Sequence, residues 1–343
     1  MGTPRLTDVA IRAGVSMKTV SNVVNGTGSA SPATRARVQA VIEEIGYRPN
    51  VTARRLATGQ TGTISVAVSS VTVPYFAEIS NRLDRIARQQ QLRVVIEQTH
   101  GDRNNELAVL EERERGLVDG DIFHPVALTP DDLASQRPGF PLVLLGEGPA
   151  PQGVDHVMID NVAAARELTM RLIDHGCREI AFLGTERHAL AHTTRQRFDG
   201  YKKALRASKI RLDRRLRLTV DRYSADDGYR AVTEAIDNGV PFDGIVCRDD
   251  SLAAGALHAL HARGVMVPDD VAVAGWDDLI ISRHLWPPLT SVEPDKEAIV
   301  EAALRLLHDR IHGFDGPGRH EIVASRLVER RSTQRNSGDS TAP

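Results

Sequence analysis

The chain has 343 residues, of which 41% are hydrophobic and only 4% aromatic, and its net charge is −2. This length allows two or three domains with a sizeable core, and small aliphatic residues favour alternating helices and strands over an all-β fold. No run approaches 18 apolar residues, which argues against a membrane-spanning helix. The two cysteines, Cys177 and Cys247, exclude a disulfide framework and a zinc-ligand spacing. Without an apolar segment near the start that would direct secretion, we expect a cytoplasmic protein.

Charge is distributed unevenly along the chain. Residues 1–60 hold eight lysines and arginines against three acidic residues, a net charge of +5, and the remaining residues carry −7. A basic head on an acidic body indicates that the head alone binds a polyanion such as nucleic acid.

Three short helices are predicted in the head. Capping residues and glycines delimit them as Thr7 to Gly14, Ser16 to Gly26 and Ser31 to Gly46, with Thr7, Ser16 and Ser31 as N-caps. Valines, alanines and isoleucines recur inside these segments at helical spacing and should form a small core. Two short helices joined by Ala-Gly-Val are typical of a helix-turn-helix.

The second helix of a helix-turn-helix enters the major groove of DNA. Its outer face carries Met17, Lys18 and Asn22, which can reach a thymine methyl group, guanine and adenine, respectively. Short polar side chains suited to phosphate oxygens stand at Ser16, Thr19, Ser21, Asn25 and Thr34, and Leu6, Thr7, Ser31 and Tyr47 complete the predicted DNA surface. The alternative is a solvated three-helix bundle with no partner, which leaves the charge split unexplained.

Residues 51–58 have the composition of two helical turns, which are marginal as an isolated helix in water. Their apolar members have no core of their own, so we expect the segment to fold only where another molecule supports it. Gly59 and Gly62 then predict a flexible joint to the body.

The stretches LTDVAIRAGVSMKTVSNVVNG and SPATRARVQAVIEEIGYRPNVTARRLATGQTGTISV resemble the LacI/GalR family of bacterial transcription regulators. Later stretches, among them RQRFDGYKKAL and CRDDSLAAGALHALHARGVMVPDDVAVAGWDD, extend the likeness to roughly residues 5–331. The resemblance implies a homodimer on a pseudo-palindromic operator, with a hinge helix in which Asn50, Ala53 and Leu56 meet the minor groove and Leu56 wedges into a base step. Many members have arginine where this chain has Asn22, so the family operator is not implied.

After Gly62 the chain alternates between predicted strands and helices. The first series of strands is TISVAVSS, LRVVIEQ, DIFHPVA and LVLLGE, and the second is EIAFLG, LRLTV, GIVCR and DVAVAGW. Continuous apolar strands between helices predict doubly wound parallel sheets in two similar α/β lobes. The resemblance implies a periplasmic-binding-protein-like core whose chain crosses between lobes near Asp160 and again near residues 287–294.

We therefore expect four regions. They are a helix-turn-helix DNA-binding domain at 1–49, a hinge helix and linker at 50–61, an effector-binding and dimerisation core at 62–331, and a disordered polar tail at 332–343.

Ligands of open α/β sheets bind beyond the C-terminal ends of the strands. Polar and aromatic side chains follow several of these ends, at Tyr75, Phe76, His124, Arg197, Tyr223, Asp249, Asp250, Trp276, Asp277 and Asp278. An arginine with acidic residues can hold the hydroxyls of a sugar, and an aromatic ring can stack on its apolar face. The sequence therefore predicts a sugar site between the lobes.

The family resemblance implies effector contacts at Tyr75, Phe76, His124, Thr193, Arg197, Tyr223, Asp249, Asp277 and Lys296. Family members more often have asparagine at position 249, so Asp249 adds a negative charge with which Lys296 could pair. Packing roles for Tyr75, Phe76 and His124 remain alternatives, as do a loop-holding role for Asp250 and a capping or dimer-bridging role for Asp278. A nucleoside or purine is the alternative ligand, because the Tyr75–Phe76 pair resembles that of purine-responsive members.

The sequence has no P-loop, HExxH or GxSxG motif, so we expect no enzyme and no cofactor. His188 and His192 are too loosely placed to predict a metal site. We interpret the chain as a ligand-controlled, nucleoid-associated transcriptional regulator, of a type that mostly represses. The alternative is a soluble sugar-binding sensor whose output is not transcription. With no C-terminal leucine heptad, a dimer is expected rather than a tetramer.

Overall fold

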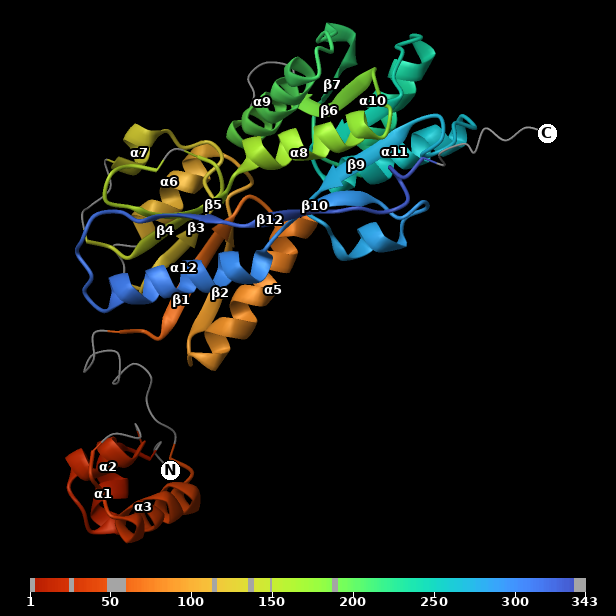
Figure 1. Ribbon diagram of the computed structural model, residues 1–343. Coiled ribbons are helices and arrows are strands. Elements are labelled where there is room, and N and C mark those ends of the chain that lie inside the picture. Colours follow the sequence, from red (N-terminus) through yellow and green to blue (C-terminus); the bar gives the residue numbers. More distant parts are fainter. Residues whose placement is uncertain are drawn as a thin grey trace. The chain divides into compact units, whose positions relative to one another are not determined.

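The computed structural model describes residues 4–24, 28–47, 60–112, 116–134, 139–148, 150–186 and 191–335. The chain divides into two compact units, Met1–Gly62 and Thr63–Pro343, which we call the head and the core (Figure 1). None of the helices in the described ranges has the length and apolar character needed to cross a membrane.

The head consists of α1 (Leu6–Ala13), α2 (Met17–Val24) and α3 (Pro32–Ile45). Each helix contributes buried residues to one apolar cluster, which comprises Val9, Ala10, Ala13, Val20, Val23, Val38, Val41 and Tyr47. Gly14 and Gly46 end α1 and α3 with φ of 64°, a left-handed conformation that glycine adopts without the steric cost of a Cβ atom. The predicted three-helix arrangement is confirmed.

Two of the three predicted helix starts are confirmed. The Ser16 hydroxyl accepts a hydrogen bond from the Thr19 amide at 3.1 Å, and Ser31 caps α3 with proline at its first position. The prediction of Thr7 as the first N-cap is wrong, because α1 begins at Leu6 with Arg5 in the cap position. The Asp8 carboxylate accepts from the Arg5 amide at 2.7 Å and so fixes the earlier start. Asn25 and the predicted hinge helix lie outside the described residues.

The first lobe of the core contains a six-stranded parallel sheet in the order β11-β5-β4-β3-β1-β2. Its strands are β1 (Thr63–Val68), β2 (Arg93–Gln98), β3 (Asp121–Phe123), β4 (Leu142–Leu145), β5 (Asp155–Ile159) and β11 (His320–Val323). Its helices are α5 (Pro74–Gln89), α6 (Arg103–Glu112), α7 (Pro130–Ala134) and α12 (Lys296–Ile311). Figure 1 shows the late helix α12 lying along this lobe.

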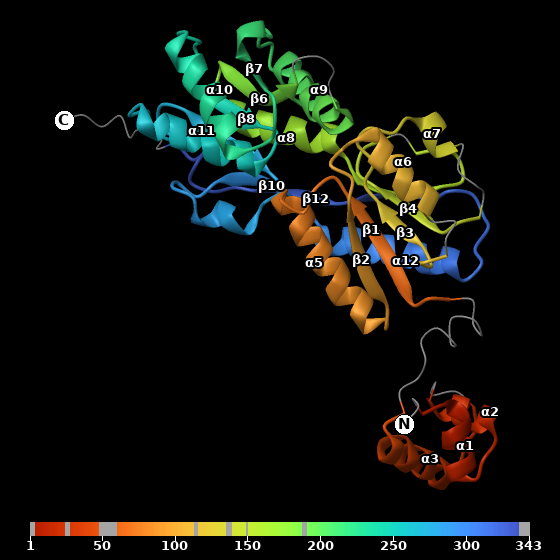
Figure 2. The same cartoon turned by 180° about the vertical axis from the view of Figure 1, so that it is seen from behind.

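The second lobe repeats this plan with the strand order β12-β10-β9-β8-β6-β7, in which only β12 is antiparallel to its neighbour. Its strands are β6 (Ile180–Glu186), β7 (Arg217–Val220), β8 (Gly244–Cys247), β9 (Ala272–Trp276), β10 (Thr290–Pro294) and β12 (Ser325–Val328). Its helices are α8 (Asn161–Asp174), α9 (His192–Ala207), α10 (Ala225–Asp237) and α11 (Asp250–Ala262), and Figure 2 shows them from behind. Short 3₁₀ turns occupy Arg214–Leu216 and Ile280–His284.

The central strands of both sheets are buried on two faces, and the alternation along β6 is an example. Ile180 and Phe182 join the apolar cluster that contains α8 and α9, whereas Ala181 and Leu183 join the cluster that contains α10 and α11. Because successive residues of a strand point to opposite faces, a strand covered on both sides must be apolar throughout. The predicted doubly wound α/β fold is confirmed, and both cysteines are buried and free as expected for small core residues.

The chain passes between the lobes three times. The first passage, at Asp160, and the second, at Asp295 directly after β10, agree with the expected positions. A third passage at Ala324, between β11 and β12, was not predicted. These two strands are short and partly exposed, so they lack the continuous apolar run by which the other strands are recognised.

The predicted tail boundary at residue 332 is wrong. Ser332 and Thr333 are fully buried, and the Ser332 hydroxyl accepts from the Thr290 amide at 2.8 Å and donates to the Val273 carbonyl at 2.6 Å. Arg335 donates to the Asp243 carbonyl at 2.6 Å. Ser332 satisfies backbone groups of β9 and β10, and Arg335 satisfies one directly before β8. Composition alone cannot reveal these roles, and the core continues at least to residue 335.

Candidate functional site

The head presents the start of α2 to solvent. Met17 is 53% exposed and Lys18 is also exposed, whereas Asn22 is half-buried. The Ser16 and Thr19 hydroxyls lie 2.9 Å apart, so part of their hydrogen-bonding capacity is used within the helix start. The arrangement leaves one apolar and one cationic side chain free to enter a groove beside small hydroxyl groups.

The other residues of the predicted DNA surface differ in exposure. Thr7 and Ser31 are exposed, and the Ser31 hydroxyl lies 2.9 Å from that of Thr34. Leu6 is half-buried against the head cluster, and Tyr47 belongs to that cluster with 8% of its surface exposed. Most of the Tyr47 ring therefore supports the fold of the head.

A cavity of about 400 Å³ lies between the two lobes of the core. Eight of the nine predicted effector residues line it: Tyr75, Phe76, His124, Thr193, Arg197, Tyr223, Asp249 and Asp277. They follow the C-terminal ends of strands from both sheets, as the strand-end rule predicts for parallel α/β sheets. Lining residues that the sequence analysis did not assign to the effector site include Ser69, His100, Glu147, His192, Arg248 and Ser251.

Arg197, on α9, is the central cation of the cavity wall. It is 7% exposed, its Nε donates to Asn161 Oδ1 at 2.8 Å, and one Nη donates to the Arg248 carbonyl. Its other Nη lies 3.9 Å from Asp277 Oδ1, and its guanidinium stacks 4.1 Å from the centre of the Trp276 ring. Burial lowers the pKa of Arg197, against the raising effect of Asp277. These contacts hold a charged, planar donor at a fixed place in the wall.

Glu147, which follows β4, connects the lobes across the cavity. It accepts from Asn161 Nδ2 at 2.7 Å and from the Thr193 hydroxyl at 2.5 Å. Burial opposes ionisation, but Arg197 and the Thr193 hydrogen bond together hold the pKa of Glu147 below its ordinary value. The strand LVLLGE ends at this residue, so the strand-end rule could have identified it.

Asp249 has a different partner from the one predicted. Its Oδ1 caps α11 by accepting from the Leu252 amide at 2.9 Å, and its Oδ2 lies 2.8 Å from Arg248 Nη1. The Arg248 guanidinium also lies 3.5 Å from the centre of the Tyr223 ring, a cation–π contact. Arg248 therefore neutralises Asp249.

Lys296 does not line this cavity, and its predicted pairing with Asp249 is wrong. Its ammonium is 2.7 Å from Glu78 Oε2 and donates to the Asp278 carbonyl at 3.1 Å. Glu78 in turn accepts from the Ile280 amide at 3.1 Å. Lys296 is the first residue of α12, directly after the second passage between lobes. Through Glu78 and the Asp278 carbonyl, its ammonium links α5 to the turn that follows β9.

The aromatic residues of the first lobe combine packing with exposure to the cavity. Phe76 is 8% exposed and belongs to the main apolar cluster, and its ring meets Tyr75 edge-on at 5.4 Å and His124 at 4.7 Å. Burial lowers the pKa of His124, which favours the uncharged imidazole. His124 Nδ1 is buried and has no hydrogen-bond partner among the described residues.

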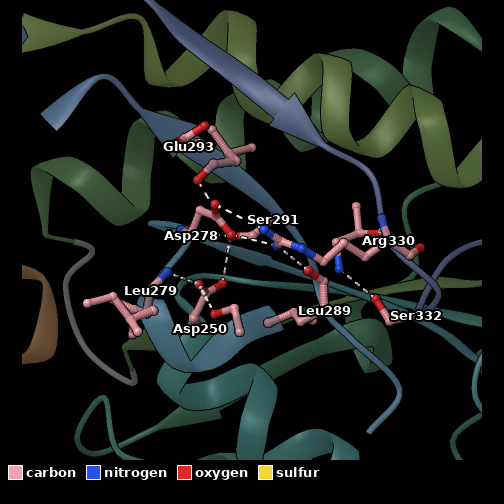
Figure 3. A network of polar contacts seen from close by, with 12 residues as sticks. Asp250, Asp278, Leu279, Leu289, Ser291, Glu293, Arg330 and Ser332 are labelled. Carbon is pink, nitrogen blue, oxygen red and sulfur yellow. Dashed lines mark hydrogen bonds and ion pairs between the residues drawn. The ribbon is translucent and has the colours of Figure 1, made fainter. Parts of the chain in front are cut away.

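The backbone is strained where Asp277 meets the cavity. Asp277 and Asp278 have φ of 95° and 42°, values in the left-handed region that non-glycine residues rarely adopt. The Asp278 amide donates to Ser291 Oγ at 3.0 Å, and the Arg330 guanidinium binds both oxygens of the Asp278 carboxylate (Figure 3). Asp278 therefore makes an ion pair within its own chain. Burial raises the pKa of its neighbour Asp277 to about 6.

Asp250 holds this turn through hydrogen bonds to its carboxylate. Its carboxylate accepts from the Leu279 amide at 2.8 Å, the Ser282 hydroxyl at 2.6 Å and the Ser291 hydroxyl at 2.7 Å (Figure 3). Asp250 thus holds the 278–282 turn and β10, rather than its own loop as the alternative had it. The net pKa of Asp250 is about 7, because the raising effect of burial exceeds the lowering effect of its three hydrogen-bond donors.

A helix-turn-helix head joined to a two-lobed core with a polar cavity between its lobes defines a ligand-responsive DNA-binding regulator. Residues 5–50 match the sequence profile "Bacterial regulatory proteins, lacI family", and residues 169–333 match "Periplasmic binding protein-like domain". The chain is 33% identical to the HTH-type transcriptional regulator CelR of Thermobifida fusca, over 96% of this chain and 98% of that one. The chain belongs to the lacI family of bacterial regulatory proteins, which confirms the resemblance seen in the sequence.

Solved structures agree with this assignment. The CelR–cellobiose complex is 31% identical over 96% of this chain and 99% of that one, with a TM-score of 0.71. The lac repressor dimer bound to operator and an anti-inducer is 25% identical over 97% of this chain and 99% of that one, with a TM-score of 0.83. Both matches span the head and the core together.

Proposed function

We propose that this chain represses transcription as a homodimer whose affinity for a pseudo-palindromic operator is controlled by a sugar bound between the core lobes. The observation that carries the proposal is a cavity in which buried Arg197 and Asp277 and half-buried Glu147 converge from both lobes. Cellobiose is bound to the related CelR, and the related lac repressor binds operator as a dimer. These relatives favour a transcriptional output over the alternative of a sensor without one.

The head supplies DNA recognition in this proposal. Lys18 and Met17 at the exposed start of α2 read base edges, and the neighbouring hydroxyl groups hold phosphate oxygens. Residues 50–61 form the hinge, where the family resemblance assigns the minor-groove contact to Leu56. We assign effector binding and dimerisation to residues 62–335 and place the protein in the cytoplasm on the nucleoid.

The cavity supplies effector recognition. Arg197 donates to sugar hydroxyls, and the carboxylates of Glu147 and Asp277 accept from them. The rings of Tyr75 and Tyr223 offer apolar surface to the CH face of the sugar. These are binding roles, and we assign the cavity no catalytic role.

The dimer buries apolar side chains that one copy leaves exposed. Ile280 and Ile281 are 61% and 54% exposed and Trp286 is 87% exposed, all in the segment after β9. In the first lobe, Val95 and Ile96 are exposed on β2, which is an edge strand of its sheet. Exposed apolar groups and an uncovered strand edge both favour association with a second copy.

The effector acts by changing how the lobes close. Glu147 of the first lobe already bonds to Asn161 and Thr193 of the second, so a ligand at these groups alters contacts between lobes. Closure across a dimer changes the separation of the two hinge segments and hence operator affinity. Coupling free energies of this kind are typically about 1–3 kcal/mol, or roughly 5–150-fold in affinity.

The test begins with the operator. Full-length protein is incubated with fragmented genomic DNA from its source, and the bound fragments are sequenced and searched for a shared pseudo-palindrome. Operator affinity is then measured with and without glucose and cellobiose, which also reveals whether the ligand releases or promotes binding. If binding of the DNA fragments depends on salt but not on their sequence, the proposal is overturned.

A matched pair of variants assigns the response to the cavity. Arg197→Ala should retain operator binding and lose the effect of the sugar, because it removes the central donor of the wall. Arg206→Ala changes the same residue type at an exposed position of the same helix and should behave as wild type. Equal responses in both variants would remove Arg197 from the site.

A further inference from the structure

We propose that the cavity selects uncharged saccharides and that Asp249 excludes phosphorylated ones by occupying Arg248. This inference rests on the proposed function and specifies the chemical class of its effector. It is carried by the pairing of charges in the wall of the cavity, where Arg248 pairs with Asp249 and Arg197 faces Asp277.

Arg248 is the cation that could otherwise bind a phosphate group. Its Nη1 lies 2.8 Å from Asp249 Oδ2 and its Nε donates to the Thr194 hydroxyl at 2.9 Å. The face of its guanidinium covers the Tyr223 ring. Arginine binds phosphate tightly when two of its nitrogens donate side by side. A phosphate group at Arg248 would therefore compete with an existing ion pair and an existing hydrogen bond.

Arg197 is occupied in the same manner. Its Nε donates to Asn161 and one Nη to the backbone carbonyl of Arg248, while the other Nη faces Asp277 at 3.9 Å. Its remaining N–H groups can donate to neutral hydroxyls without disturbing these partners. An anion bound at the same arginine would lie close to the Asp277 carboxylate, and the like charges would repel each other.

The charge balance of the cavity wall also disfavours an anionic ligand. Among the described lining residues, the arginines are Arg197 and Arg248, and the carboxylates are Glu147, Asp249 and Asp277. Three anions against two cations oppose an added negative charge. The opposition is strong because Arg197, Asp249 and Asp277 are buried and Glu147 and Arg248 are half-buried. Carboxylates that keep unused lone pairs accept from hydroxyl groups, which a saccharide provides in number.

Lys296 does not alter this balance. Its ammonium is buried against Glu78 and the Asp278 carbonyl, outside the cavity lining. The cation that might have offset Asp249 is thus committed elsewhere in the fold.

The aromatic wall also disfavours a flat purine, the alternative ligand considered from the sequence. The Tyr75 and Phe76 rings meet at 68° and Phe76 meets His124 at 65°, so neither of these pairs forms a parallel slot. The cavity volume of about 400 Å³ lies at the lower end of the range for small-molecule sites, roughly 300–1,000 Å³. We therefore expect a mono- or disaccharide.

The test compares neutral and phosphorylated sugars on the full-length protein. Titration calorimetry with glucose, cellobiose and their 6-phosphates should give wild-type affinities at least tenfold higher for a neutral sugar than for its phosphate. In Asp249→Asn this ratio should shrink at least tenfold, because Arg248 loses its ionic partner. Asparagine is a good N-cap, so the Leu252 amide keeps an acceptor and α11 keeps its start.

The matched control is Asp160→Asn. Asp160 also caps a helix, accepting from the Ala163 amide at 2.9 Å, but it is exposed and does not line the cavity. It loses the same charge and should keep the wild-type preference, which separates a local effect of Asp249 from a change in net charge.

The outcomes separate this inference from the proposed function. If a phosphorylated sugar or a purine binds best and still changes operator affinity, the selectivity inference fails and the regulator stands. An unchanged preference in Asp249→Asn would remove Asp249 as the excluding residue. If no sugar binds and operator affinity responds to none, the sugar-controlled function fails together with the inference.

Discussion

Replacing Asp250 by alanine tests how the strained turn at the cavity is held. The substitution removes the acceptor of the Leu279 amide and of two serine hydroxyls, all of them buried. The hydroxyls can rotate toward other acceptors, whereas the Leu279 amide has a fixed direction. Leaving one buried donor unsatisfied costs about 1–3 kcal/mol, and the two weakened hydroxyl bonds add about 1 kcal/mol. We expect a total loss of about 2–4 kcal/mol in the free energy of unfolding.

Asp250→Asn is the matched control for this change. Its amide oxygen can accept from the Leu279 amide and its amide nitrogen can donate to the Ser291 hydroxyl, so the network keeps its connections. The loss should be about 1 kcal/mol or less. Denaturant unfolding of both variants, followed by circular dichroism, measures the difference. Equal stability of the two variants would refute the argument that the carboxylate holds the turn through these bonds.

The Asp250→Ala substitution should also weaken effector binding. Leu279 and Asp277 both line the cavity, and the turn between them is strained, so it depends on external support. Sugar affinity measured by calorimetry should fall in Asp250→Ala, while operator affinity without sugar stays near wild type. A fall in operator affinity alone would place the role of Asp250 elsewhere.

Three further predictions follow from the described geometry. Burial raises the pKa of Asp250 to about 7 and that of Asp277 to about 6, so between pH 3.8 and these values the native core keeps protons that the unfolded chain releases. The stability that these two groups contribute is therefore full below the ordinary pKa of 3.8 and is lost as the pH rises toward 7. Wild-type stability relative to Asp250→Asn should therefore fall by about 2 kcal/mol between about pH 5 and about pH 7 in denaturant titrations; a flat difference contradicts the shift for Asp250. Gly275→Ala places a Cβ atom 2.2 Å from Asp250 Oδ1 and should lower the melting temperature clearly, which an unchanged thermal scan would disprove. Lys18→Ala should weaken operator binding by about 1–3 kcal/mol in fluorescence anisotropy, with sugar affinity unchanged.

The parts of the fold that the sequence predicted are those set by local chemistry. Serine caps mark the starts of α2 and α3, left-handed glycines mark the ends of α1 and α3, and continuous apolar runs mark the central strands. The cavity could be anticipated because the C-terminal ends of parallel strands meet at one edge of a sheet. The strand-end rule therefore identified Arg197 and Asp277 before their contact was known.

What only the tertiary structure decided are the pairings between distant segments. Lys296 meets Glu78 rather than Asp249, and Arg248 takes Asp249 instead, because the second passage between the lobes turns α12 toward α5. Ser332 is buried, although its surroundings in the chain are polar, since its hydroxyl completes the backbone hydrogen bonds of β9 and β10. A side chain's partner depends on which strands become neighbours, and that order is fixed by packing across the whole core, whereas capping and periodicity act within a few residues and are legible in the sequence itself.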